Sequence, residues 1–219
     1  MKQICTLRAA VAQITDCASI MIGGFVCCGM ALRLIDALLE QGTKELTIIS
    51  NDAGYPDKGV GKLVGANRIR KLIASYLGPN PDVGRKMNSG ELLVELVPQG
   101  TLAERIRCGG AGLGGILTPT GIGTEVERGK QIITVDGKQY LVEMPLRADF
   151  SFVKAHVCDK MGNAFIAKSS KNFNVVMAMA ARHTIVETDE LVEPGALDPE
   201  RVSVPGVFVK TIAWSNSHE

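Results

Sequence analysis

Apolar residues in the N-terminal half of the chain alternate between short runs and helical spacing. Residues 7–14 carry apolar side chains at i, i+3, i+4 and i+7, and Thr6 is placed as the N-cap of that helix. A second amphipathic stretch runs from Leu34 to Leu39, with Gly42 placed to cap its C-terminal end. Short strands are expected between these helices at 19–22, 46–49, 72–74 and 92–94. This alternation is typical of βαβ crossovers around a mainly parallel sheet.

The C-terminal half continues the pattern and adds a hairpin. The run from Thr101 to Glu104 matches a capping box, which predicts a helix from there to about Cys108. Asp136 and Gly137 separate two β-type runs, as in a tight hairpin. Further strands are expected at 150–157, 164–167, 184–186 and 207–212, and a helix at 175–181. We therefore expect a single domain over residues 1–219, an α/β fold with an open, mainly parallel sheet, helices on both faces and a small β-hairpin insertion.

Composition narrows the functional classes. Hydrophobic residues make up 46% of the 219 positions and charged residues 21%, which excludes a disordered chain. The net charge of +1 offers no basic excess for a phosphate backbone, so no nucleic acid partner is expected. No apolar run approaches the ~20 residues of a membrane span, and the first residues lack the apolar core of a signal peptide. We expect no membrane partner and a cytoplasmic location.

The first candidate site is the segment 23–29, which carries three glycines between a predicted strand and a predicted helix. Ligands of open α/β sheets bind beyond the carboxyl ends of the strands, where helix N-termini offer free N–H groups to anions. This clustering favours a ligand site over a turn that only needs positive φ. Cys27 and Cys28 are interpreted as small packing residues, because no His or carboxylate adjoins them in sequence. The six cysteines show no metal-ligand spacing, and no metal site is expected.

The second candidate is the glycine-rich stretch 109–115. Gly110, Gly112 and Gly115 formally satisfy the dinucleotide fingerprint G-x-G-x-x-G, and Asp136 lies downstream. That fingerprint requires a strand before it and a helix after it, whereas this stretch follows a predicted helix. A dinucleotide site is therefore not expected, and a loop that approaches a ligand or a partner subunit is favoured.

The third candidate is the polar group that follows two strands. Asn51 and Gln99 come directly after apolar runs, at the edge of a parallel sheet where chemistry usually occurs. An amide there can donate to a developing oxyanion or hold a carboxylate, although turn-capping roles fit equally well. His156, His183 and His218 are interpreted as structural or surface residues. No common nucleophile or phosphate-loop motif is present, so spacing alone indicates a ligand-binding α/β domain whose nucleophile is not evident.

Short motifs along nearly the whole chain resemble the A (alpha) subunits of the family I coenzyme A transferases. Residues 16–25, with Gly29 four positions on, resemble the first family motif. Further matches follow in order at 50–52, 97–102, 107–112, 118–121, 145–149 and 162–163. The resemblance is strongest to the acetate, butyrate and acetoacetate transferases. Two positions depart from the family pattern, with Cys17 in place of Gly or Asn and Ala31 in place of Pro.

The resemblance implies an enzyme that moves coenzyme A between a short-chain acyl-CoA and a free carboxylic acid by a ping-pong mechanism. The family nucleophile is a glutamate in a Ser-Glu-Asn-Gly motif on the B (beta) subunit, which forms a glutamyl-CoA thioester. No Glu of this chain is followed by Asn, so the resemblance implies a beta-subunit partner, in an α2β2 assembly. Coenzyme A enters as the acyl-CoA substrate, and no tightly bound cofactor is implied.

The resemblance also implies roles for individual residues. Gln99 supports the thioester oxyanion, while Gly23, Gly24, Phe25 and Asn51 lie in the substrate site near the acyl group. The glycine loop at 109–115 is expected in or near the subunit boundary.

Three alternatives remain open at this point. One is a related CoA-using subunit, either a glutaconate-type transferase or a hydratase-like relative. Another is a sugar-phosphate-sensing domain of similar fold, although such regulators carry a helix-turn-helix and a basic face that this chain lacks. The third is a scaffold subunit that has lost activity. The preferred acid is not decided by the sequence, because an apolar pocket discriminates one methylene by only ~1–3 kcal/mol.

Overall fold

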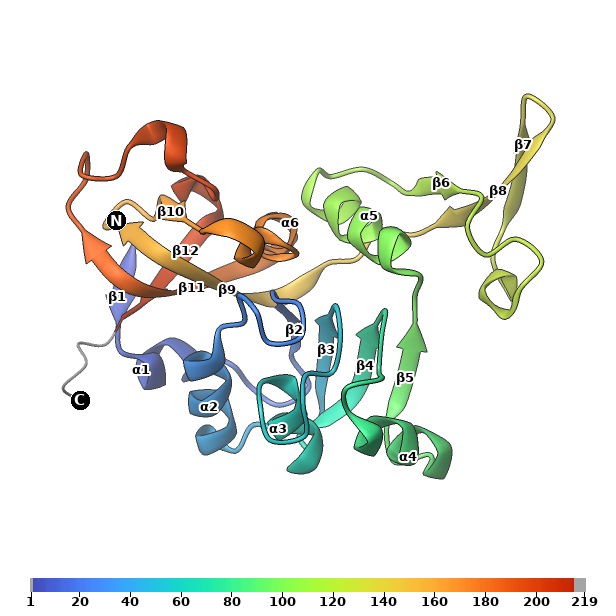
Figure 1. Ribbon diagram of the computed structural model, residues 1–219, viewed down its shortest axis with the longest axis horizontal. Helices are drawn as coiled ribbons and strands as arrows, with labels where there is room; N and C mark the ends of the chain where they lie inside the picture. Colours follow the sequence, from blue (N-terminus) through green and yellow to red (C-terminus); the bar gives the residue numbers. More distant parts are fainter. Residues whose placement is uncertain (1, 215–219) are drawn as a thin grey trace.

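A nine-stranded sheet forms the centre of the computed structural model, which describes residues 2–214 (Figure 1). Its strands lie in the order β1-β12-β11-β9-β2-β3-β4-β5, and these neighbours all pair in parallel. The remaining strand, β10, pairs antiparallel with β9. The expectation of an open, mainly parallel sheet is confirmed. The strands are β1 (Gln3–Cys5), β2 (Ser19–Ile22), β3 (Leu46–Ser50), β4 (Ile69–Ala74), β5 (Leu93–Leu96), β9 (Ala148–Asp159), β10 (Ala164–Phe165), β11 (Ala181–Val192) and β12 (Val209–Ala213).

Helices cover both faces of this sheet. On one face lie α1 (Leu7–Val11), α2 (Leu32–Gln41), α3 (Val60–Gly65) and α4 (Pro81–Ser89), and on the other α5 (Gln99–Gly110) and α6 (Asn174–Met179) (Figure 1). Successive residues of a strand point to opposite faces. Thus Ile48 is buried in the core cluster that contains residues of α1–α4, while Ile49 is buried with those of α5 and α6.

A separate three-stranded antiparallel sheet extends away from the main sheet (Figure 1). It consists of β6 (Ile116–Thr118), β7 (Ile132–Val135) and β8 (Lys138–Glu143). The predicted hairpin is confirmed, with Asp136 and Gly137 at φ 50° and 74° in the turn between β7 and β8. The third strand, β6, was not predicted, because three residues are too few to display an alternating pattern.

The predicted start of the helix at Thr101 is wrong. The helix α5 begins at Gln99 with Pro98 as its N-cap, and Leu102 donates its backbone N–H to the Pro98 carbonyl at 2.8 Å. Thr101 is therefore inside the first turn, and within the described residues its buried hydroxyl has no hydrogen-bond partner. The fixed φ of a proline favours the earlier start over the capping-box pattern.

Several other element ends also differ from the predictions. The helix predicted at 7–14 ends at Val11, and the one predicted at 175–181 ends at Met179, because β11 begins two residues later. The predicted strand at 207–212 begins only at Val209, after the 3-10 turn η4 (Gly206–Phe208). Three more 3-10 turns are η1 (Glu125–Glu127), η2 (Lys168–Lys171) and η3 (Pro199–Arg201).

The hydrogen bonds and backbone angles at the predicted helix caps agree with the predictions. The Thr6 hydroxyl accepts the Ala9 N–H at 3.3 Å, and Gly42 adopts φ 85° after α2, so both predicted caps are confirmed. Cys17 adopts φ 67°, a left-handed conformation that Gly or Asn would adopt at lower cost. Ala31 has φ −77°, a value that proline also allows.

Two further expectations concern His218 and the lack of a membrane-spanning segment. The C-terminal His218 lies outside the described residues. Among residues 2–214, no helix has the length and apolar character needed to cross a bilayer.

Candidate active site at the carboxyl edge of the sheet

The strand order reverses beside β2. From β2 the chain continues through β3, β4 and β5 on one side, whereas β9, β11 and β12 lie on the other. Ligands of open α/β sheets bind in the crevice at such a reversal, outside the carboxyl ends of the strands. The segment 23–29 follows β2 at this edge, and Gln99 opens the helix that follows β5. The predicted site residues therefore lie at the expected edge.

Asn51 holds the side chain of Gln99. The Nδ2 atom of Asn51 donates to Oδ2 of Asp52 at 2.8 Å, and a carboxylate only accepts, so the orientation of the Asn51 amide is fixed. Its Oδ1 then accepts from Nε2 of Gln99 at 2.7 Å and from the Ser75 hydroxyl at 3.0 Å. Asn51 is only 1% exposed. In this arrangement the buried Asn51 orients the amide of Gln99. Gln99 is an exposed residue, and its amide has a second N–H that can be donated.

Asp52 links the end of β3 to the glycine turn. Its Oδ2 also accepts the Val26 N–H at 2.8 Å, and its Oδ1 accepts the Gly54 N–H at 2.8 Å. With the Asn51 amide, this fully buried carboxylate accepts from three N–H groups. A buried charge needs such compensation, and satisfying it fixes the loop after β3 relative to the glycine turn.

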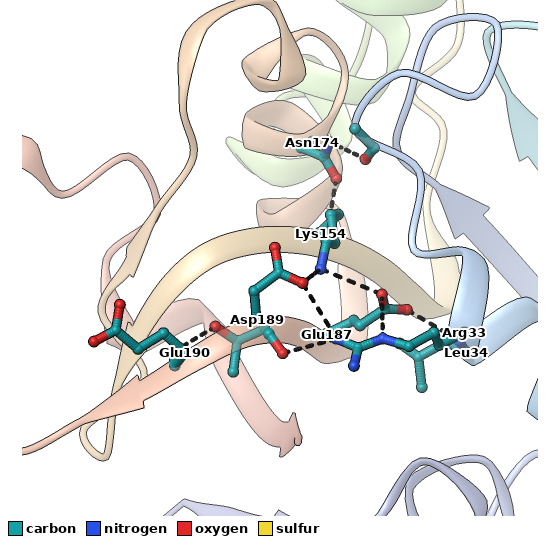
Figure 2. Close-up of polar contacts among 9 residues, drawn as sticks. Arg33, Leu34, Lys154, Asn174, Glu187, Asp189 and Glu190 are labelled. Carbon is teal, nitrogen blue, oxygen red and sulfur yellow. Dashed lines mark hydrogen bonds and ion pairs between the residues drawn. The ribbon is translucent and has the colours of Figure 1, made fainter. Parts of the chain in front are cut away.

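Two asparagines hold the glycine turn from the opposite side. The Oδ1 of Asn172 accepts the Gly24 N–H at 3.1 Å, and its Nδ2 donates to the Cys28 carbonyl at 3.0 Å. Asn174, which is fully buried, donates to the Gly29 carbonyl at 2.7 Å and accepts the Lys154 backbone N–H at 3.1 Å (Figure 2). We call Asn172 and Asn174 the asparagine pair. Neither asparagine is predicted from the sequence.

The glycines of this turn are required by packing. A Cβ atom on Gly23 would lie 2.1 Å from Oδ1 of Asn174, and one on Gly29 would lie 2.7 Å from the Ser170 carbonyl oxygen. Gly24 and Gly29 also have φ of 132° and 73°. The turn can therefore approach its neighbours only without side chains.

The expectation that this turn offers free N–H groups to an anion is wrong for its first four residues. Gly23 donates to the Phe152 carbonyl, Phe25 to the Cys28 carbonyl, and the other two donate to Asn172 and Asp52. A contact of Gly23 or Gly24 with substrate stays a prediction, and it would have to involve atoms other than these N–H groups.

A cluster of charged residues supports the helix that follows the turn. Glu187 of β11 is 2% exposed, and it accepts the Leu34 N–H at 3.0 Å and Nε of Arg33 at 3.1 Å (Figure 2). The Nζ of Lys154 lies 3.4 Å from the same carboxylate. The N-cap residue Ala31 has no polar side chain to accept an N–H of the first turn. Glu187 on β11 accepts one instead, and its negative charge suits the N-terminus of α2.

A cavity of about 190 Å³ opens beside Gln99. Four of its lining side chains are apolar and two are amides: Phe25, Ala103, Phe173 and Val176, with Gln99 and Asn172. Larger hollows of about 270, 410 and 550 Å³ lie at the amino ends of the strands, and one of about 330 Å³ lies beside α1 and α2. Because ligands of parallel sheets bind at the carboxyl ends, the cavity beside Gln99 is the candidate active site. We call it the amide cavity.

The glycine-rich stretch 109–115 has a different setting. Gly109 and Gly110 close the last turn of α5, where added Cβ atoms would lie 1.9 Å from the Leu146 carbonyl oxygen and 2.7 Å from Cβ of Met179. A helix precedes this stretch and β6 follows it, so the context of a dinucleotide fingerprint is absent from this described segment. Its place at a subunit boundary stays a prediction.

His156, His183 and Cys27 have structural surroundings, whereas Cys28 is exposed, so the packing role expected for it is wrong. His156 accepts the Ala167 N–H at 3.1 Å, and His183 lies 2.8 Å from the Thr211 hydroxyl, while burial lowers the pKa of His183. Burial raises the pKa of Cys27, which keeps this thiol protonated and a poor nucleophile. Among residues 2–214, no group of three His, Cys, Asp or Glu side chains is arranged to hold a metal ion.

Comparison with known proteins identifies the family. The model of the coenzyme A transferase family matches residues 4–214. The chain belongs to this family. It is 52% identical over 213 residues to the acetate CoA-transferase subunit alpha of Escherichia coli K12, covering 97% of each chain. It is also 52% identical over 197 residues to the acetoacetyl-CoA:acetate/butyrate CoA transferase alpha subunit of Clostridium acetobutylicum, covering 90% of each. The resemblance inferred from the motifs is confirmed.

Solved structures of CoA-transferases share the fold. An acyl-CoA transferase from E. coli O157:H7, solved as a thioester complex with CoA, superposes with a TM-score of 0.88 at 22% identity. The match covers 100% of this chain and 48% of that one, so the chain corresponds to about half of that polypeptide. Glutaconate coenzyme A-transferase from Acidaminococcus fermentans gives a TM-score of 0.85 at 20% identity, covering 97% and 75%. The predicted fold class is confirmed.

Proposed function

We propose that this chain is the alpha subunit of a short-chain acyl-CoA:carboxylate CoA-transferase that acts on acetate, butyrate or acetoacetate. The names of its relatives at 52% identity support the reaction and the substrate class. The observation that carries the proposal is the amide cavity, where an oriented Gln99 amide borders a small apolar hollow. Such a hollow suits an acyl group with a carbonyl at one end.

Gln99 supplies the polar part of the chemistry. Its Nε2 gives one hydrogen to Asn51, and the second, which has no acceptor among residues 2–214, can bind the thioester carbonyl oxygen. That oxygen gains negative charge when the carbonyl is attacked, so the hydrogen bond strengthens in the transition state. Because Asn51 and Asp52 already hold the amide in place, little reorganisation is needed during the reaction.

The nucleophile in this proposal is a glutamate of the beta subunit. Among residues 2–214, none of those lining the amide cavity carries a carboxylate, and nearby Asp52 is buried under three N–H donors. The partner's carboxylate attacks the acyl-CoA carbonyl and expels CoA thiolate, giving an acyl-glutamyl anhydride. The thiolate then attacks the glutamyl carbonyl, which releases the free acid and leaves a glutamyl-CoA thioester. A second acid reverses these steps and leaves as its CoA thioester.

The residues that line the cavity also argue against the alternative of a glutaconate-type transferase. A dicarboxylic substrate carries a second carboxylate, which needs a cation or several N–H donors once it is removed from water. In the described part of the chain, the cavity is lined by apolar groups and two amides, with no cationic side chain. This composition favours a monocarboxylic acid.

We place the enzyme in the cytoplasm as an α2β2 assembly. All six cysteines are free thiols in the structure, as is usual for proteins of reducing compartments. The relatives are named as alpha subunits, which implies a separate partner for each of them.

The proposal is tested by CoA exchange between acetyl-CoA and butyrate. We expect no exchange by the purified chain alone and exchange once the beta subunit of its own enzyme is coexpressed and copurified. Exchange by the lone chain would contradict the division of roles. A stable complex without exchange for any short-chain acid would contradict the function.

A further inference from the structure

We infer that Val176 and Ala103 set the length of the acyl chain that the enzyme accepts. The inference rests on the proposed function, since it assigns the apolar part of the amide cavity to the acyl chain. Both residues line that cavity together with Gln99.

The two residues come from different helices. Ala103 lies four positions after Gln99 on α5, and residues at this spacing share one face of a helix. Val176 lies on α6, which packs closely against α5 where Gly110 meets Met179. An acyl carbonyl bound to Gln99 would therefore direct its chain along the α5 face toward these small side chains. Neither residue carries a polar atom that could bind a carboxylate, so each acts by its volume.

The size of the cavity matches a short acyl chain. Its volume of about 190 Å³ lies below the range of about 300–1,000 Å³ that is usual for ligand pockets. An acetyl group has three heavy atoms, a butyryl group five and an acetoacetyl group six. A hexanoyl group has seven, and in our account its longer tail meets Val176 or Ala103. We assign the limit to these two residues because they are the aliphatic side chains of the lining, and Phe25 is 46% exposed.

Changing the volume of the cavity should therefore change chain-length preference. In the reconstituted complex, kcat/KM is measured for acetate, butyrate and hexanoate with acetyl-CoA or butyryl-CoA as donor. Val176→Ala enlarges the cavity, and we expect the hexanoate-to-acetate ratio to rise by about tenfold, the low end of the discrimination per methylene. Ala103→Leu fills the cavity, and we expect the butyrate-to-acetate ratio to fall by about tenfold.

Val175→Ala is the matched control. Val175 is the neighbouring residue on α6, is also half-buried, and packs against the core cluster that contains Val153 and Val186. Its truncation should lower the melting temperature about as much as that of Val176 and leave the substrate ratios unchanged.

The outcomes are distinct from those that test the function. If all three variants exchange CoA with wild-type ratios, the inference is wrong and the proposed function stands. If Val175→Ala shifts the ratios as much as Val176→Ala, the effect is general loosening and the inference is again wrong. If Val176→Ala does not fold, Ala103→Leu decides alone. A wild-type complex that exchanges none of the acids removes both the proposed function and the inference.

Discussion

The Oδ1 atom of Asn51 accepts a 2.7 Å hydrogen bond from Nε2 of Gln99, although 48 residues separate the two along the chain. The contact joins the ends of β3 and β5, which are not adjacent in the sheet. It gives the two amides different roles, because Asn51 is buried and Gln99 is exposed. Gln99 meets the substrate in our account, and Asn51 is a positioning residue that acts through it.

Replacing Gln99 should slow the chemical step. Loss of one oxyanion donor costs about 10²–10³ in rate, so Gln99→Ala should lower kcat by that factor with little change in KM. Gln99→Glu keeps the size but adds repulsion against the developing charge, and it should be slower still. Steady-state kinetics and melting temperatures of the reconstituted complexes check this. Near-normal kcat in a complex that assembles poorly would instead make Gln99 a structural residue.

Replacing Asn51 should act through Gln99. Asn51→Ala removes the acceptor that orients the amide, and we expect kcat to fall by about tenfold, a moderate loss of preorganisation. In a double-mutant cycle, Asn51→Ala should cost little more once Gln99 is already alanine, because coupled residues are not additive. Full additivity of the two losses in kcat would show that Asn51 acts independently of Gln99.

Removing Asn174 should destabilise the glycine turn. Asn174→Ala leaves the Gly29 and Ser170 carbonyls and the Lys154 N–H without this partner, and each buried orphan group costs about 1–3 kcal/mol. We expect at least about 2 kcal/mol lower stability in denaturant unfolding and a higher KM for acyl-CoA in the complex. Asn88→Ala, at an exposed position of α4, is the control and should change neither. Equal effects of the two variants would contradict the proposed role of Asn174 in holding the glycine turn.

Replacing Cys17 should stabilise the chain. Its φ of 67° costs a non-glycine residue roughly 1–2 kcal/mol. Glycine avoids this cost, but it loses more conformational entropy on folding, which cancels part of the gain in stability. Cys17→Gly should therefore raise the free energy of unfolding by about 1 kcal/mol without changing kcat. Chemical denaturation measures it. An unchanged or lower stability would mean that the cysteine side chain contributes packing that offsets the strain.

Local features of the fold were predictable because neighbouring residues determine them. The Thr6 cap, the Gly42 cap and the Asp136-Gly137 turn follow from a few adjacent side chains and were found from sequence. The capping box at Thr101 failed because Pro98, three residues earlier, already allowed the helix to begin. Competing local signals of this kind are resolved only by the tertiary structure.

The candidate site was predictable only in outline. Asn51 and Gln99 were found because polar residues at strand ends gather at one edge of a parallel sheet, but their mutual hydrogen bond carries no sequence signal. The asparagine pair was missed, because Asn172 meets Gly24 across 148 residues. The engaged N–H groups of Gly23, Gly24 and Val26 also pair with residues distant in the sequence, whereas that of Phe25 pairs with the nearby Cys28 carbonyl.

Trapping the covalent intermediate tests the central claim most directly, that this chain provides the amide cavity and its partner provides the nucleophile. The complex of this chain with its beta subunit is incubated with acetyl-CoA, reduced with borohydride and digested for mass spectrometry. Borohydride reduces an enzyme thioester to an alcohol and so marks the residue that carried CoA. Our account predicts the mark on one glutamate of the beta subunit and none on this chain, in both the wild type and, at lower yield, Gln99→Ala. A reduced glutamate or aspartate in this chain would contradict it.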